Sequence, residues 1–186
     1  MTYYGGKEMA ATFRTVRENT VKIAEEIPED KYGFKPASDC RTIGQTLAHI
    51  ALGPGFQHYI QTNKISDLKT VNFMELMQQA QTEEAKPRTK AEIISFLKSE
   101  GEKFASFLDG LQESFLGESV TMPAGMQPPT KSRFEMLLSA KEHEMHHRGQ
   151  LMTFQRMIGQ VPHLTRQMQE RMTQRAAQAA AVPPQQ

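Results

Sequence analysis

Two histidines spaced four residues apart are the clearest sign of chemistry in this chain. His143 and His147 bound the segment His-Glu-Met-His-His. On an α-helix, residues four apart project from one face, about one turn from each other. Two imidazoles in this arrangement can bind a single metal ion, as they do in the metal sites of helical proteins. The apolar residues beside this face turn the pair toward the core: Met136, Ala140, Leu151, Phe154 and Ile158.

A third histidine can complete a set of ligands. His49 lies beside Leu47 and Ile50, on the apolar side of another helical segment. Taken alone, His49 would be an ordinary half-buried histidine. The pair also has an alternative without a metal, because buried imidazole nitrogens can bond to neighbouring side chains or to solvent at the end of a bundle. We favour a metal site formed by His49, His143 and His147.

The other three histidines are weaker candidates for metal ligands. His146 points roughly a quarter turn away from the ligand face, which indicates a surface residue or one that supports the ligands. His58 and His163 have no partner at ligand spacing, and we interpret both as structural.

The segment 143–147 also spells H-E-x-x-H, the helical motif of zinc metalloproteases. In those enzymes the glutamate, here Glu144, acts as a general base and a third ligand follows downstream. The only histidine downstream is His163, beyond Gly159 and Pro162, and no strand-rich segment precedes the motif. A metallohydrolase of this type is therefore the less favoured alternative.

Start and stop signals place four long amphipathic helices. The first runs over residues 7–27 and stops at Pro28. Each of the other three opens with a capping-box pattern, a hydroxyl residue followed three positions later by Gln or Glu; the pairs are Thr42 and Gln45, Thr89 and Glu92, and Ser132 and Glu135. The last helix continues to Gly159. Strand-like alternation is absent, so the sequence predicts an all-α four-helix bundle.

The connections between these helices are long crossovers. About fourteen residues separate the first two helices, and the next connection contains a short helical piece over residues 72–81. Gly53, Pro54 and Gly55 predict a kink or an early end of the second helix, because proline removes a backbone donor. We expect one bundle domain over residues 1–163. The tail over residues 164–186, rich in Ala and Gln, is expected to be partly helical.

Composition and charge exclude several classes of protein. Lys and Arg total 22 against 21 for Asp and Glu, and this balance argues against binding of nucleic acid. The single cysteine, Cys40, rules out an internal disulfide framework and fits a reducing compartment. Residues 1–22 lack the apolar core of a secretory signal, and no apolar run approaches a membrane span. A soluble cytoplasmic protein is expected.

Two segments of the chain resemble the DinB-like superfamily of damage-inducible, metal-binding four-helix bundles. They are Thr-Ile-Gly-Gln-Thr-Leu-Ala-His-Ile at 42–50 and His-Glu-Met-His-His-Arg-Gly-Gln-Leu at 143–151. The resemblance extends over nearly all of residues 1–163, including the turn Lys-Pro-Ala at 35–37. It implies that one histidine of the second helix and two of the last bind the metal, which matches His49, His143 and His147.

The resemblance further implies a zinc or nickel ion, with water or exogenous groups completing its shell. It also implies a homodimer, although the Ala/Gln-rich tail departs from the family pattern. Some members are transferases or isomerases that act with low-molecular-weight thiols such as mycothiol or bacillithiol. A thiol S-transferase or isomerase, acting on a small-molecule thiol and an electrophilic substrate, is therefore one class of expected function. A non-catalytic, stress-induced protein that binds a metal or a small molecule is the other.

Three neutral imidazoles leave the charge of a divalent ion undiminished and at least one coordination position open. A closed structural zinc site would have four protein ligands. An open site can lower the pKa of a bound water or thiol. Glu144 is the nearest candidate base, although we favour a solvated helix residue. Arg148 can hold a substrate carboxylate or cover the helix edge, and Cys40 is expected to be passive.

Overall fold

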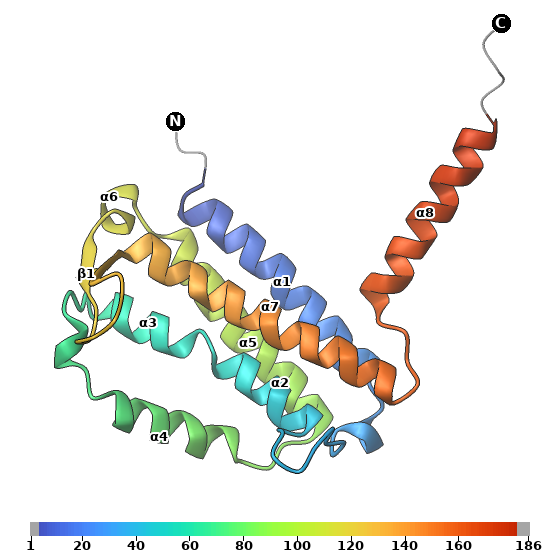
Figure 1. The fold of residues 1–186 in the computed structure, drawn as a ribbon, viewed down its shortest axis with the longest axis horizontal. Helices are drawn as coiled ribbons and strands as arrows, with labels where there is room; N and C mark the ends of the chain where they lie inside the picture. The colour runs from blue at the N-terminus through green and yellow to red at the C-terminus, as the bar shows by residue number, and fades with distance from the viewer. Residues whose placement is uncertain (1–3, 182–186) are drawn as a thin grey trace, which may run out of the picture.

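Four long helical segments run alongside one another in residues 4–181, the part of the chain described by the computed structural model (Figure 1). They are α1 (Gly6–Glu26), the broken helix α2 (Ile43–Leu52) and α3 (Gly55–Thr62), α5 (Lys90–Asp109) and α7 (Arg133–Met157). Helices α1 and α2 each pack on both α5 and α7. The prediction of an all-α four-helix bundle with long crossover connections is confirmed.

Shorter elements occupy the connections. They are two 3-10 turns, η1 (Glu29–Lys31) and η2 (Leu68–Thr70), the helices α4 (Phe73–Glu84) and α6 (Glu113–Leu116), and the strands β1 (Ser119–Thr121) and β2 (Thr130–Ser132). The strands form one small antiparallel hairpin, in which Val120 pairs with Lys131. Helix α4 contacts α2 and is longer than the short helical piece predicted over residues 72–81. No helix among residues 4–181 is long and apolar enough to cross a membrane.

The predicted helix starts at Thr42, Thr89 and Ser132 are confirmed, but one of the three capping boxes is incomplete. Thr42 and Thr89 form complete capping boxes with Gln45 and Glu92. At α7 only half of the box forms, because Ser132 Oγ accepts a hydrogen bond from the backbone N–H of Glu135 while the Glu135 carboxylate pairs with Lys131 instead. Ser132 is also the last residue of strand β2, so hairpin and helix meet at this residue.

The second bundle helix breaks at Gly53 and Pro54, as the sequence predicts. Helix α2 ends at Leu52 and α3 begins at Gly55. Pro54 has no N–H and cannot bond to the carbonyl of Ile50, one turn earlier. The break lies one turn beyond His49 and therefore separates the histidine-bearing part of this helix from α3.

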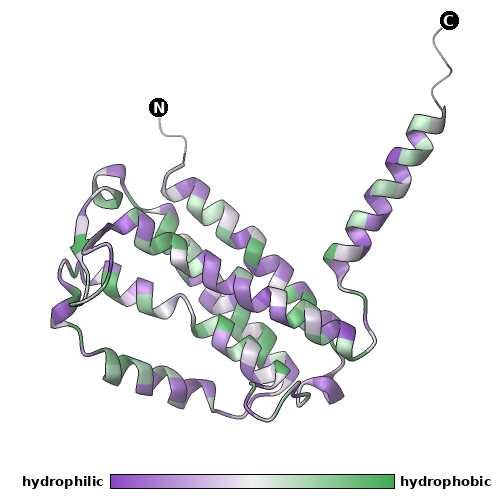
Figure 2. Ribbon diagram, in the orientation of Figure 1, coloured by the Kyte–Doolittle hydropathy of each residue, from purple (hydrophilic) through white to green (hydrophobic). Residues whose placement is uncertain are grey.

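Two large apolar clusters fill most of the bundle, and a smaller third one joins α3, η2, β1 and Met136 of α7. Hydrophobic positions alternate with hydrophilic ones along each helix (Figure 2). One large cluster joins the second half of α1, helix α2, the first half of α5 and Leu151 of α7. The other joins the first half of α1, the second half of α5 and the first half of α7, and includes the edge-to-face pair Phe13 and Phe104. The middle of the bundle, between the two large clusters, is polar.

Helix α8 (His163–Ala181) spans most of the segment that the sequence marks as a tail. It projects away from the bundle (Figure 1). Its first turn is anchored, because His163 Nε2 bonds to Asn19 Oδ1 at 3.1 Å and Arg166 pairs with Glu26. Met168 and Met172, further along, are exposed.

Truncation of a core aromatic should cost far more stability than truncation on α8. Phe13 is 1% exposed and packs on Phe104 with ring centroids 5.0 Å apart. We expect Phe13→Ala to lower the free energy of unfolding by about 3–5 kcal/mol, because it removes apolar burial and leaves a cavity. Met172→Ala, on an exposed position, should change it by less than about 0.5 kcal/mol. Urea denaturation measures both, and equal effects would contradict this account of the core.

Candidate metal centre

The three histidines singled out from the sequence lie together in the structure. One ring nitrogen from each of His49, His143 and His147 falls within 4.8 Å of the other two. The ring centroids are 4.6–4.9 Å apart. His49 comes from α2, and the other two come from successive turns of α7, so the group bridges two helices. The assignment of these residues as metal ligands stays a prediction.

One pair of nitrogen atoms is spaced nearly as one small divalent ion requires. His49 Nε2 and His143 Nε2 are 3.0 Å apart. Two nitrogens bound tetrahedrally to zinc at about 2.0–2.1 Å would be roughly 3.3 Å apart. The His49 and His143 rings therefore need only small movements to bind an ion between them. The donor set, three imidazoles with no carboxylate or thiolate among them, suits zinc, nickel and similar ions.

Glu84 orients the His49 ring from outside the group. Its Oε2 is 2.9 Å from His49 Nδ1, so the Nδ1–H donates to the carboxylate and the Nε2 lone pair faces the other histidines. Arg41 in turn donates to the same carboxylate. Burial raises the pKa of Glu84, but its bonds to Arg41 and His49 outweigh this and hold that pKa below its usual value. Such carboxylate–histidine pairs commonly support metal ligands.

Gln150 orients His147 in the same way, from the next turn of α7. Its Oε1 is 2.8 Å from His147 Nδ1, which leaves Nε2 of that ring for an ion. The Gln150 amide nitrogen lies 3.2 Å from His146 Nε2. His146 is exposed and packs edge-on against the His147 ring. It thus lies outside the group of three and contacts it only through His147 and Gln150.

A glycine makes room for the third ring. A Cβ on Gly53 would lie 2.7 Å from His143 Nδ1 and 2.9 Å from Cε1 of the same ring. Such distances are shorter than side chains tolerate, so His143 can approach α2 only because residue 53 has no side chain. The break in the bundle helix and the position of this ligand are therefore connected.

The rings are neutral at ordinary pH, as metal ligands must be. Burial lowers the pKa of His143 to about 4, and the neighbouring His147 and His49 rings add to this shift. Burial also lowers the pKa of His49 and His147, while their bonds to Glu84 and Gln150 partly oppose the change. Because burial disfavours protonation, each of the three rings keeps a nitrogen lone pair in this partly buried site.

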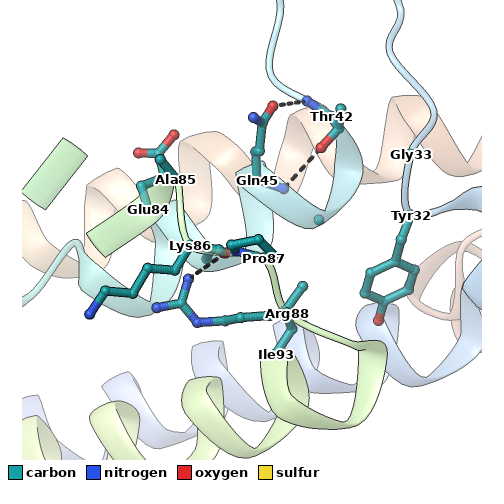
Figure 3. Close-up of a pocket in the computed structure, with 12 residues that line it drawn as sticks. Tyr32, Gly33, Thr42, Gln45, Glu84, Ala85, Lys86, Pro87, Arg88 and Ile93 are labelled. Atoms are coloured by element: carbon teal, nitrogen blue, oxygen red, sulfur yellow. Dashed lines mark hydrogen bonds between the residues drawn. The ribbon is translucent and has the colours of Figure 1, made fainter. Parts of the chain in front are cut away.

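A cavity of about 600 Å³ opens beside His147. Its lining is mostly polar and comes from the segment before α2, from α2 itself, from the end of α4 and from α7: Asp39, Cys40, Arg41, Gln45, Thr46, Glu84, His147, Gln150 and Phe154. A second cavity of about 290 Å³ lies between the start of α2 and the α4–α5 connection (Figure 3). The two cavities share Gln45 and Glu84 in their walls.

The expectation that Glu144 is a solvated helix residue is wrong. Its side chain is 1% exposed and forms an ion pair with Arg17 of α1. Glu144 directly follows His143, and successive residues project in different directions around a helix. The Glu144 side chain therefore points into the middle of the bundle instead of toward water. Because Arg17 bonds to both carboxylate oxygens, Glu144 is not placed as the base of the H-E-x-x-H motif.

The remaining candidates lie around or away from the group. Arg148 is half-buried and close enough to His163 to contribute to the lowered pKa of that ring, which burial chiefly causes. Cys40 is half-buried in the wall of the larger cavity. His58 packs edge-on against Phe107, and His163 bonds to Asn19. Neither His58 nor His163 joins the group of three.

Four residues that shape the site were missed by sequence reasoning. Gln150 follows His147 at a helical spacing of three, a signal that was available. The sequence marks Gly53 only as a helix breaker. Glu84 is 35 residues beyond His49 along the chain. Arg41 lies shortly before α2 but acts on His49 only through Glu84, and nothing in the local sequence marks either residue.

Loss of His49 should remove metal binding, whereas loss of His146 should not. His49→Ala takes away the only ligand from α2, and two ligands from one helix cannot complete the shell. We expect metal affinity to fall by more than the roughly 10–100-fold that loss of an outer partner costs. His146→Ala should leave affinity nearly unchanged. Competition titrations with a chromogenic chelator measure both, and the reverse order of effects would show that the ligands are wrongly assigned.

Removal of the Glu84 carboxylate should weaken metal binding without removing a ligand. Glu84→Ala frees the His49 ring to rotate, and an affinity loss of roughly 10–100-fold is expected. Glu83→Ala is the matched control, since Glu83 pairs with Lys86 and Arg88 and contacts no histidine of the group. Isothermal titration of both variants with zinc compares them. Equal affinities would mean that Glu84 plays no part in orienting His49.

Comparison with known proteins agrees with this architecture. YjoA of Bacillus subtilis (strain 168), an uncharacterized protein, is 24% identical over 152 residues, covering 82% of this chain and 90% of YjoA. The crystal structure of B. subtilis YjoA, described as a DinB-like protein, matches with a TM-score of 0.61 at 21% identity, covering 83% of this chain and 94% of that one.

Two further structures share the fold. YfiT from Bacillus subtilis, described as a probable metal-dependent hydrolase with an unusual four-helix bundle topology, matches with a TM-score of 0.65 at 10% identity, covering 86% of this chain and 91% of YfiT. An uncharacterized protein from Clostridium difficile 630 matches with a TM-score of 0.62 at 12% identity, covering 84% and 98%. The family model of the DinB family matches residues 1–179. The chain belongs to the DinB family.

Proposed function

We propose that this protein is a metal-dependent transferase that holds zinc or nickel on His49, His143 and His147 and activates a low-molecular-weight thiol. The observation that carries the proposal is the convergence of three neutral imidazole nitrogens, one from each ring, beside a cavity of about 600 Å³. Among the described residues the group contains no fourth protein ligand of the usual kinds. The arrangement is that of an open site and not of a closed structural one.

A divalent ion in such a site supplies Lewis acidity, which lowers the pKa of a thiol or water bound to it. The chain supplies the remaining requirements. Glu84 and Gln150 fix the His49 and His147 rings, so that their Nε2 atoms point to one place. The neutral rings leave the charge of the ion undiminished, which favours an anionic sulfur near neutral pH.

The cavity beside His147 provides the space in which the second substrate would lie. Arg41 on its wall uses Nε and Nη2 on Glu84 and presents a half-exposed guanidinium to the cavity. Thr46, Gln45 and Gln150 offer further hydrogen-bonding groups. In the transfer step the sulfur forms a bond to an electrophilic carbon, the leaving group departs with its electron pair, and the thiol proton passes to solvent.

Hydrolysis is the second candidate, and one observation favours it. YfiT, which shares the fold, is described as a probable metal-dependent hydrolase. The same open site can activate water in place of a thiol. A protein that binds the ion without catalysis is the remaining alternative.

The test compares thiol and water as nucleophiles on metal-loaded protein. Zinc- and nickel-loaded samples are assayed with 1-chloro-2,4-dinitrobenzene and, in turn, cysteine, glutathione, coenzyme A, bacillithiol and mycothiol. We expect at least one thiol to give conjugation above the uncatalysed rate, with loss of chloride, and we expect His49→Ala to abolish the increase.

The controls separate the three candidates. His146→Ala should retain the activity. Metal-dependent cleavage of p-nitrophenyl esters without any thiol, in the absence of conjugation, would replace the transferase with a hydrolase. Tight metal binding with neither activity would leave a metal-binding protein.

A further inference from the structure

A buried ion pair lies in the middle of the bundle, between the two large apolar clusters. Arg17 of α1 and Glu144 of α7 have side chains only 5% and 1% exposed. Arg17 Nε lies 3.0 and 3.1 Å from the two carboxylate oxygens, and Nη2 lies 2.9 Å from Oε2. Replacement of a buried pair by apolar residues is often neutral or stabilising. Stability of the fold is therefore a weak explanation for this pair.

The other donors of Arg17 reach the two remaining bundle helices. Nη1 donates to the Leu97 carbonyl of α5 at 2.7 Å, and Nη2 donates to the Ile50 carbonyl of α2 at 3.1 Å. One guanidinium from α1 thus bonds to α2, α5 and α7 together. Both helices that carry the histidines are among them.

The Ile50 carbonyl is an acceptor left over by the helix break. Its helical partner would be the N–H of residue 54, which is proline and has none. Gly53 N approaches it only at 3.3 Å. Arg17 therefore satisfies the broken end of α2 at the residue directly after His49. A buried carbonyl without this bond would be costly, and the end of α2 would be free to move.

On α7 the same guanidinium holds the residue directly after His143. Glu144 also lies three positions before His147, within the same turn. Arg17 bonds to both carboxylate oxygens of Glu144, so α7 cannot rotate about its axis without breaking these bonds. Rotation of α7 is the movement that would separate the two α7 rings from His49.

A glycine inside α5 makes room for the Arg17 side chain, although glycine is a poor helix former. Gly101 lies in the interior of α5, where glycine disfavours helix. A Cβ at this position would lie 2.7 Å from Arg17 Cγ and 3.1 Å from Nη1. The glycine leaves the space through which the arginine reaches the middle of the bundle.

We propose that Arg17 is a positioning residue of the metal centre, which fixes His49 through the Ile50 carbonyl and the α7 histidines through Glu144. The inference rests on the metal-binding part of the proposed function and is independent of its thiol chemistry. The ion pair sets the separation of the ligands, and metal affinity depends on it more than folding does.

The test replaces both partners, so that no charge is left buried alone. Arg17→Met/Glu144→Met should still fold, because no charge is left buried alone, although loss of the bonds to the Leu97 and Ile50 carbonyls should lower its melting temperature. Its affinity for Co²⁺, measured by titration, should fall at least roughly tenfold, as loss of an outer partner does. The visible absorption of bound Co²⁺ should also change, because the ligand geometry changes. Gly101→Ala, which displaces Arg17, should lower the affinity in the same direction while it favours helix.

Arg133→Met is the matched control. Arg133, the first residue of α7, is also a buried arginine and is 1% exposed. It bonds to Glu118, to Gln61 and to the Ile65 carbonyl. Its loss should lower the melting temperature and leave Co²⁺ affinity and absorption unchanged. Equal affinity in unchanged protein, the double variant and Gly101→Ala would overturn the proposal, as would an equal affinity loss in Arg133→Met.

A metal-free readout separates this proposal from the proposed function. In ¹⁵N-labelled apoprotein, the imidazole signals of His49 and His143 should shift in the double variant, while those of His58 stay in place. If the unchanged protein binds no Co²⁺, the proposed function fails, and these signals alone decide whether Arg17 positions the rings. Unchanged His49 and His143 signals would then overturn the positioning role.

Discussion

Three imidazole nitrogens from two helices can share one ion only if the helices are held at a fixed distance and a fixed rotation. Helices α2 and α7 meet this condition where residue 53 is glycine, since any side chain there would collide with His143. The position of the His143 ring against the end of α2 thus depends on this glycine. Much of the remaining architecture can be understood as support for this approach, because α1 packs against α7, α5 packs against α2, and α1 and α5 pack against each other.

The electrostatics of the site follow from partial burial. Removing imidazoles from water disfavours their charged forms, so the rings remain neutral and keep their lone pairs. Neutral rings are also free to donate from Nδ1, which explains why a carboxylate and an amide oxygen lie there. Arg41 compensates the Glu84 charge, so the carboxylate can orient His49 without being an isolated charge beside a half-buried ring.

The fold was largely accessible from the sequence because its signals are local. Capping boxes at Thr42 and Thr89, proline at 28 and the Gly-Pro break at 53–54 each fix a helix end through neighbouring backbone groups. The spacing of His143 and His147 is equally local. What the sequence could not supply were contacts between distant segments, such as Glu84 with His49, or Arg17 with Glu144. Glu144 shows most clearly what sequence reasoning misses. Its direction around α7 follows from its position in the sequence, but its pairing with Arg17, which makes its burial tolerable, does not.

The irregular positions of this bundle coincide with its chemistry. Glycine at 53 and 101 and proline at 54 all disfavour continuous helix, and each has a partner in or near the site. Gly53 admits the His143 ring, Pro54 leaves the Ile50 carbonyl to Arg17, and Gly101 admits Arg17 itself. Conflicts between local preference and overall fold are expected where function imposes them. A bundle selected for stability alone would have continuous helices and an apolar centre. This chain instead places a charged pair there. Glu144 directly follows His143, and Arg17 bonds to the carbonyl of Ile50, which directly follows His49, so the middle layer is built around the geometry of the ligands.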